Sequence, residues 1–198
     1  MRVVAGTLKG RRVTAVKGEN TRPTSDKIKE SIFNMIGPYF DGGLVLDLYS
    51  GSGNLGIEAL SRGIEKGIFV DKEHDAVRTI RKNVEALGLE RRVEIYRNDA
   101  FKALKALVKR ELQFDLILLD PPYKGQQINA IIEFVSEHHL LIAGGVVMAE
   151  CLKADELYES IGDIKQIRRE IYGITAISIY KKERDEADEK SRNVSWNI

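Results

Sequence analysis

The sequence contains little cysteine or histidine and no long apolar run. Its 198 residues include a single cysteine, Cys151, and three histidines, His74, His138 and His139. One cysteine excludes an internal disulfide and a cage of cysteine thiolates, and the histidines lack metal-ligand spacing, so we expect no metal site. The N-terminus has no apolar signal segment and no run is long enough to cross a bilayer, which predicts a cytoplasmic protein without a membrane partner.

The chain as a whole also lacks an excess of one charge. Lys and Arg number 31 while Asp and Glu number 30, so the net charge of +1 says nothing about partners. The distribution is more informative, because residues 1–22 carry six basic side chains against a single acid, Glu19. Two β-prone pieces in this segment flank residues 7–10, which predicts a basic β-hairpin over 1–22. Residues 183–198 are rich in charge and have no apolar periodicity, so we expect a disordered tail there.

Short apolar runs alternate with amphipathic helical segments in the rest of the chain. The runs cover residues 44–49, 67–71, 93–97, 115–120 and 144–150. This alternation predicts an α/β domain over 23–182, with a parallel sheet covered by helices on both faces. A helix is expected over 26–36, with Ile32 and Phe33 on its apolar face. Residues 164–182 hold two β-like stretches without a helix between them, so we expect a hairpin whose last strand runs antiparallel.

A glycine-rich loop follows the first apolar run. Gly51, Gly53 and Gly56 spell G-x-G-x-x-G between a predicted strand and a predicted helix. Glycines let the backbone turn sharply and approach a ligand closely, and the loop aims helix N–H groups at that ligand. The pattern alone is weak, since dinucleotide-binding oxidoreductases share it and a purely structural turn can also produce it.

Three aspartates at predicted strand ends favour S-adenosylmethionine over a dinucleotide. Asp47 precedes the loop, where it can reach the ammonium group of a methionine moiety but would repel a pyrophosphate. Asp71 ends the second strand and can accept hydrogen bonds from ribose hydroxyls, which suits either nucleotide. Asp99 follows the third strand, where it can bind an adenine amino group beside the Ala100 N–H, or cap a helix, or do both.

The chemistry is predicted from Asp-Pro-Pro-Tyr, residues 120–123, after the fourth strand. The exocyclic amine of a base is a poor nucleophile because its lone pair is delocalised into the ring. The Asp120 carboxylate and the Pro121 carbonyl can accept its two N–H bonds and aim the lone pair at a methyl donor. Pro121 and Pro122 stiffen the turn, and Tyr123 offers a face on which a base can stack. The alternative is a turn without function.

With these motifs, the sequence resembles the class I methyltransferases, and within them the RsmD family of bacterial 16S ribosomal RNA guanine-N2 methyltransferases. The stretches that carry the resemblance lie within residues 2–182 and include "RPTSDKIKESIFNMI", "LDLYSGSGNLGIEALSRG", "LDPPY" and "YGITAISIY". It implies a Rossmann-like, seven-stranded, mostly parallel sheet with an antiparallel last strand, and the 2-amino group of a guanine as the substrate. Tyr49 and Asn54 stand where the family often has Phe and Ala. The predicted cofactor contacts are Asp47, Tyr49, Ser50, Gly51, Gly53, Asn54, Gly56, Asp71, Lys72, Asp99 and Ala100.

The basic N-terminal segment is the predicted RNA contact. Phosphate-binding candidates are Arg2, Lys9, Arg11, Arg12, Lys17, Arg22, Thr24 and Lys124. The expected partner is ribosomal RNA, within the small subunit or an assembly intermediate, and the expected state is a monomer. The alternatives are a DNA adenine or cytosine amino-methyltransferase, an NAD-dependent oxidoreductase and an RNA-binding module without catalysis. The short chain argues against the first, residues 120–123 against the second, and the predicted cofactor contacts against the third.

Overall fold

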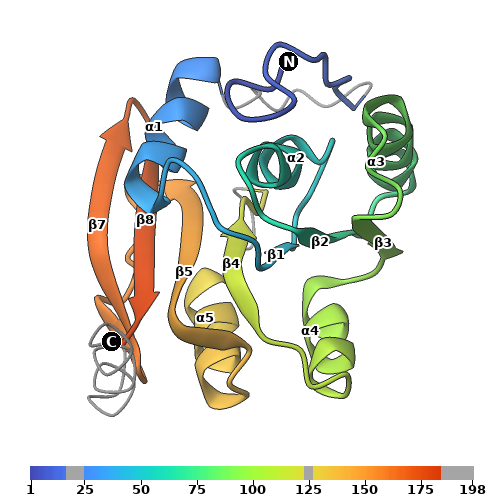
Figure 1. The fold of residues 1–198 in the computed structure, drawn as a ribbon. Coiled ribbons are helices and arrows are strands. Elements are labelled where there is room, and N and C mark those ends of the chain that lie inside the picture. Colours follow the sequence, from blue (N-terminus) through green and yellow to red (C-terminus); the bar gives the residue numbers. More distant parts are fainter. Residues whose placement is uncertain (17–24, 123–126, 184–198) are drawn as a thin grey trace, which may run out of the picture.

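A computed structural model describes residues 1–16, 25–122 and 127–183, which form a sheet of eight strands with helices on both faces (Figure 1). The helices are α1 (Asp26–Ile36), α2 (Asn54–Ser61), α3 (His74–Leu87), α4 (Ala100–Val108) and α5 (Ile128–Glu137). The strands are β1 (Leu44–Asp47), β2 (Lys66–Asp71), β3 (Val93–Arg97), β4 (Phe114–Leu119), β5 (Leu141–Leu152), β6 (Ser160–Ile161), β7 (Ile164–Tyr172) and β8 (Thr175–Lys182). The predicted residues Lys17, Arg22, Thr24, Tyr123 and Lys124 and the tail from 184 onward lie outside the described residues.

The strand order is β3-β2-β1-β4-β5-β8-β7-β6. The strands from β3 to β5 are parallel to their neighbours, while β8 runs antiparallel to both β5 and β7. The five predicted apolar runs are therefore confirmed as strands. The predicted hairpin over 164–182 is also confirmed, as is the antiparallel last strand. The implied count of seven strands is wrong by one, because the described sheet also contains the two-residue β6. A strand so short leaves no alternation in the sequence and depends only on its pairing with β7.

Two hydrophobic cores cover the two faces of the sheet. Helices α1, α2 and α3 lie on one face and α4 and α5 on the other (Figure 1). Ile32 and Phe33 of α1 are fully buried in the first core, as predicted, and Ile131 of α5 is fully buried in the second. Among the described residues, no helix combines the length and apolar character that crossing a bilayer requires.

The N-terminal arm, residues 1–16, lies on the outer surface of α2. Its two halves pair briefly around an antiparallel bridge between Arg2 and Arg12, where the Val3 N–H donates to the Arg11 carbonyl at 2.9 Å and the Val13 N–H to the Met1 carbonyl at 3.0 Å. Beyond this pairing, the backbone N–H groups of Val4 and Ala5 donate to the Glu58 carboxylate of α2, at 2.8 and 2.9 Å. The arm is therefore packed against the helical layer.

Candidate functional site

Four aspartates line one edge of the sheet. Asp47 and Asp71 end β1 and β2, Asp120 directly follows β4, and Asp99 follows β3 by two residues. Because β3, β2, β1 and β4 are adjacent and parallel, their carboxyl ends form a continuous row, the rim, about 14 Å long at ordinary strand spacing. The chain crosses from one face to the other between β1 and β4, and such a switch point is where open α/β sheets bind ligands.

The glycine loop, residues 48–53, is fastened to the end of β2. The Ser50 N–H donates to the Val70 carbonyl at 3.1 Å, and the Val70 N–H donates to Ser50 Oγ at 3.0 Å. The Gly51 N–H donates to Asp71 Oδ2 at 2.8 Å. A Cβ built on Gly51 would meet no atom within 4 Å, so this face of the loop is open to a ligand.

Gly56 allows α2 to lie unusually close to the sheet. A Cβ at this position would come within 2.3 Å of the Phe69 ring on β2 and 3.0 Å of Asp47 Oδ2. The last glycine of the motif therefore serves helix-to-strand packing, while Gly53 supplies the left-handed turn, at φ 79°, that starts the helix.

Asp71 is held with both carboxylate oxygens in defined positions. Oδ2 accepts from Gly51, and Oδ1 accepts from the Glu73 N–H at 2.9 Å. Each carboxylate oxygen can accept a second hydrogen bond, so Asp71 keeps the capacity to bind two ribose hydroxyls. The neighbouring Lys72 is exposed and lies 3.8 Å from the Glu73 carboxylate.

Asp47 is buried beneath the glycine loop, with 2% of its surface exposed. Burial raises the pKa of its carboxyl to about 7, and the negative charge of Asp71 acts in the same direction. The Gly56 N–H, which donates to Asp47 Oδ2 at 3.1 Å, opposes the rise. A cation brought next to this carboxyl would therefore restore its charge at neutral pH.

Asp99 caps α4, as one of its two predicted roles requires. Its Oδ1 accepts from the N–H groups of Phe101 and Lys102, at 3.0 and 3.3 Å. Burial raises the pKa of the half-buried Tyr49, and the Asp99 charge adds to that rise, which places the two side chains in the same part of the rim. Ala100 is the buried first residue of α4.

The strand pairing also brings Asp120 next to the glycine loop. Asp47 is opposite Leu118 in the ladder between β1 and β4, and the Leu48 N–H donates to the Leu118 carbonyl at 3.2 Å. Asp120 is half-buried, Pro121 is buried and Pro122 is exposed. The predicted acceptor pair, Asp120 and the Pro121 carbonyl, therefore lies at the same rim as the predicted cofactor contacts.

The basic residues of the arm do not gather at this rim. Leu8, next to Lys9, donates its N–H to Ser61 Oγ at 2.9 Å, and the Arg11 guanidinium donates to the Ala86 carbonyl at 2.9 Å. The Leu8 contact is at the C-terminal end of α2, away from the glycine loop, whereas Ala86 is only one helical turn from Asn83, which donates to the Ser52 carbonyl of the loop at 2.8 Å. Arg2 is closer to the loop, since its guanidinium pairs with Asp26 in the first turn of α1 at 2.7 Å, and Arg12 lies across the bridge from Arg2.

A buried charged cluster beside the loop was not predicted. Lys29 of α1 is fully buried, with its ammonium 3.2 Å from the Glu58 carboxylate, and Arg62 Nε lies 2.8 Å from the same carboxylate. Burial lowers the pKa of Lys29, and Glu58 opposes this. The available signal was the position of Lys29, three and four residues before Ile32 and Phe33 on the apolar face of α1.

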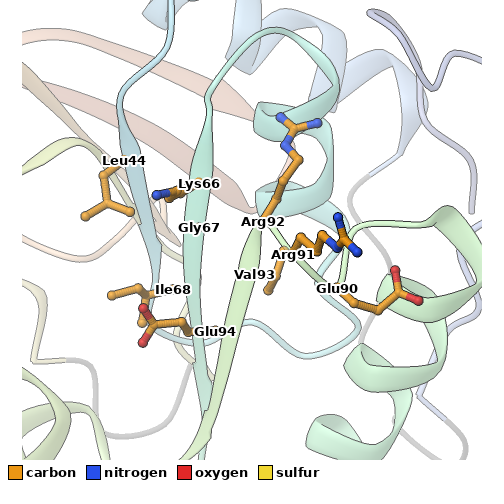
Figure 2. Close-up of a pocket in the computed structure, with 9 residues that line it drawn as sticks. All are labelled: Leu44, Lys66, Gly67, Ile68, Glu90, Arg91, Arg92, Val93 and Glu94. Atoms are coloured by element: carbon orange, nitrogen blue, oxygen red, sulfur yellow. The ribbon is translucent and has the colours of Figure 1, made fainter.

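A pocket of about 220 Å³ lies at the opposite edge of the sheet, where β1, β2 and β3 begin (Figure 2). It is lined by Leu44, Lys66, Gly67, Ile68, Glu90, Arg91, Arg92, Val93 and Glu94. The Arg92 guanidinium is bound to the carbonyls of Leu60, Ile64 and Glu65, so it closes the end of α2. The pocket contains none of the four rim aspartates and is not part of the candidate site.

The chain is similar to several known proteins. The family model described as "Conserved hypothetical protein 95" matches residues 1–181. A Bacillus subtilis relative described as "Putative rRNA methyltransferase YlbH" is 53% identical over 182 residues, covering 92% of this chain and 99% of the relative. The Haemophilus influenzae protein "Ribosomal RNA small subunit methyltransferase D" is 30% identical over 154 residues, covering 77% of this chain and 79% of that protein.

Solved structures share the fold. A conserved hypothetical protein from Streptococcus pyogenes has a TM-score of 0.74 at 39% identity, over 78% of this chain and 95% of that chain. A structure described as SMU.776, a putative methyltransferase complexed with SAH, has a TM-score of 0.64 at 13% identity, over 81% of this chain and 50% of that chain. The second likeness is one of fold alone.

Proposed function

The chain belongs to the family described as Conserved hypothetical protein 95, the RsmD family, and we propose that it methylates the 2-amino group of one guanine in small-subunit ribosomal RNA with S-adenosylmethionine. The observation that carries the proposal is the row of four aspartates at the switch point of the sheet, with Asp120-Pro121 adjacent to the glycine loop. The names of both relatives specify methyl transfer to ribosomal RNA.

The rim fits S-adenosylmethionine along its length. Asp71, with its remaining acceptor capacity, is assigned to the ribose hydroxyls, and Asp99 and Ala100 to the adenine ring. Asp47, whose pKa burial raises to about 7, is assigned to the ammonium group, directly or through a water. The open face of Gly51 leaves room for the ligand between them. When bound, S-adenosylmethionine supplies an electrophilic methyl group on its sulfonium sulfur.

Asp120 and Pro121 orient the nucleophile. The Asp120 carboxylate and the Pro121 carbonyl each accept one N–H of the guanine amine, which turns the nitrogen toward tetrahedral geometry and directs its lone pair along the line of attack. Positioning of this kind accounts for much of the rate of a transfer that needs no covalent enzyme intermediate. The target base must leave its stack to reach this rim, so a loop or junction of the RNA fits better than an intact duplex.

The RNA is assigned to the rim end of the arm. Arg2 pairs with Asp26 of α1 and Arg12 lies across the bridge from Arg2, whereas Lys9 follows Leu8, which is bound at the C-terminal end of α2. Lys17, Arg22, Thr24, Tyr123 and Lys124 keep their predicted roles in phosphate contact and base stacking on the strength of the sequence.

The test is methyl transfer from labelled S-adenosylmethionine to small ribosomal subunits from a strain that lacks this protein, followed by nucleoside analysis. We expect a single labelled 2-methylguanosine. Label in DNA, or in large-subunit RNA instead, would contradict the proposed substrate.

The control for the mechanism is Asp120→Ala. Loss of the acceptor leaves the amine unoriented, so we expect at least a 100-fold lower rate, while the Kd for S-adenosylhomocysteine changes by less than about threefold. A folded Asp120→Ala protein that no longer binds S-adenosylhomocysteine would place Asp120 in the cofactor site instead.

A further inference from the structure

Lys29 connects the N-terminal arm to the start of α2. Its ammonium donates to the Arg2 carbonyl at 2.6 Å and to Asn54 Oδ1 at 2.8 Å. Asn54 is the first residue of α2, immediately after the glycine loop. One fully buried side chain on α1 therefore holds the arm on one side and the end of the loop on the other.

Asn83 makes the same kind of connection from α3. Its amide nitrogen donates to the Ser52 carbonyl, within the glycine loop, at 2.8 Å and to the Thr14 carbonyl at 2.9 Å. Its amide oxygen accepts from the Thr14 N–H at 2.9 Å. Asn83 is only 2% exposed, so each of these bonds replaces one that the group would otherwise make with water.

The arm also completes the partners of the buried charges. The Glu58 carboxylate accepts from Val4, Ala5 and Arg62, and lies 3.2 Å from the Lys29 ammonium. A buried ion pair is tolerated only when its remaining hydrogen-bonding groups are satisfied. If the arm left α2, Glu58 would lose two donors and Lys29 would lose one acceptor, so arm, α2 and loop are expected to hold their positions together.

We propose that the N-terminal arm sets the conformation of the glycine loop through two positioning residues, Lys29 and Asn83. The arm thus serves cofactor binding as well as any contact with RNA. A purely structural role for these side chains would lower stability without a specific effect on the loop. That the arm serves cofactor binding rests on the proposed function, whereas its control of the loop conformation does not.

The test compares Lys29→Met and Asn83→Leu with a control of matched stability, Ile131→Ala, in the core on the other face of the sheet. Hydrogen exchange is measured on cofactor-free protein, and S-adenosylhomocysteine binding is measured by calorimetry. We expect both variants to lose about tenfold or more of the amide protection over residues 50–57 and to bind about tenfold more weakly or worse. The control, with an equal fall in Tm, should change neither quantity by more than about twofold.

Asn83→Asp keeps the experiment decisive if the larger changes prevent folding. Its carboxylate can still accept from the Thr14 N–H but cannot donate to the carbonyls of Ser52 and Thr14, so the variant loses the loop bond and one of the two arm bonds. The inference would be overturned if amide exchange in the loop and S-adenosylhomocysteine affinity were the same in these variants as in the Ile131→Ala control. Failure of the wild-type protein to bind S-adenosylhomocysteine would instead count against the proposed function.

Discussion

At the scale of single residues, Asp47 carries the most unusual electrostatics of the rim. Its carboxyl is buried, and the main compensation is one backbone N–H, from Gly56, together with the Ser50 hydroxyl. Such an arrangement costs stability in the absence of ligand and becomes favourable when a cation arrives. Strain of this type is common at binding sites, because the site is complementary to the complex and not to the free protein.

Asp47→Asn is expected to stabilise the cofactor-free protein at pH 8. The folded-state pKa of about 7 lies above the ordinary value of 3.8 for an aspartate carboxyl, so the folded protein holds this proton more tightly than the unfolded chain. Stability is therefore lost as pH rises from about 4 to 7 and stays low above 7. Asn removes this loss, and a shift of this size corresponds to at most about 4 kcal/mol.

Urea unfolding of both proteins at pH 5 and pH 8 measures the effect. The difference in unfolding free energy should favour the variant more at pH 8 than at pH 5, while its affinity for S-adenosylhomocysteine falls. An exposed carboxylate, Asp41→Asn, is the matched control and should show neither change. A variant that is less stable than the wild type at pH 8 would show that Asp47 is charged and well solvated.

At the scale of elements, the contact between α2 and β2 fixes the height of the glycine loop above the sheet. Gly56 faces the Phe69 ring, and the loop is bonded to the end of β2 through Ser50 and Gly51. Any outward movement of α2 would therefore pull on both attachments. The packing of α2 against β2 therefore determines the position of the loop backbone that faces the ligand.

Gly56→Ala is expected to lower the unfolding free energy by about 1–3 kcal/mol, because the new methyl group overlaps the Phe69 ring. It should also weaken S-adenosylhomocysteine binding by moving the loop. Thermal unfolding and calorimetry measure the two effects.

The second-site variant Phe69→Leu provides the control. It makes room for the methyl group, so Gly56→Ala combined with Phe69→Leu should cost less than the sum of the two single changes. Additive costs would mean that the methyl group is accommodated elsewhere and that contact with Phe69 does not set the helix position.

At the scale of the whole molecule, the arm, α1 and α3 surround α2 on the outer side of the sheet (Figure 1). The basic residues of the arm are spread along this surface and do not form one cluster. Under the proposed function, the residues on the side of α1, Arg2 and Arg12, would share an RNA with Asp120. This makes the salt dependence of RNA binding a test of the orientation of the complex.

Arg12→Gln is expected to reduce the slope of log K against log salt for 16S ribosomal RNA by about 0.7–0.9, the contribution of one phosphate contact. Lys9→Gln, which removes the same charge at the far end of α2, should leave the slope unchanged. Binding measured between 50 and 200 mM KCl distinguishes the two. The opposite ranking would move the RNA path away from the rim end of the arm.

The sequence by itself determined the parallel sheet, the positions of its strands and the four rim aspartates, because apolar periodicity and the glycine pattern are local signals. The family followed from motifs that are also contiguous along the chain. The rim aspartates could be predicted in this way because each one lies at the end of a strand that the local pattern locates.

Only the tertiary structure decided where the N-terminal arm lies and what its residues contact. The donors of Val4 and Ala5 could have met a second strand, but the Glu58 carboxylate of α2 takes them instead. Lys29 and Asn83 are charged and polar residues on otherwise ordinary helices, and their partners lie 25 or more residues away. Bonds between distant segments leave no periodic trace in the sequence, so the attachment of the arm to the glycine loop became visible only when the helices were packed together.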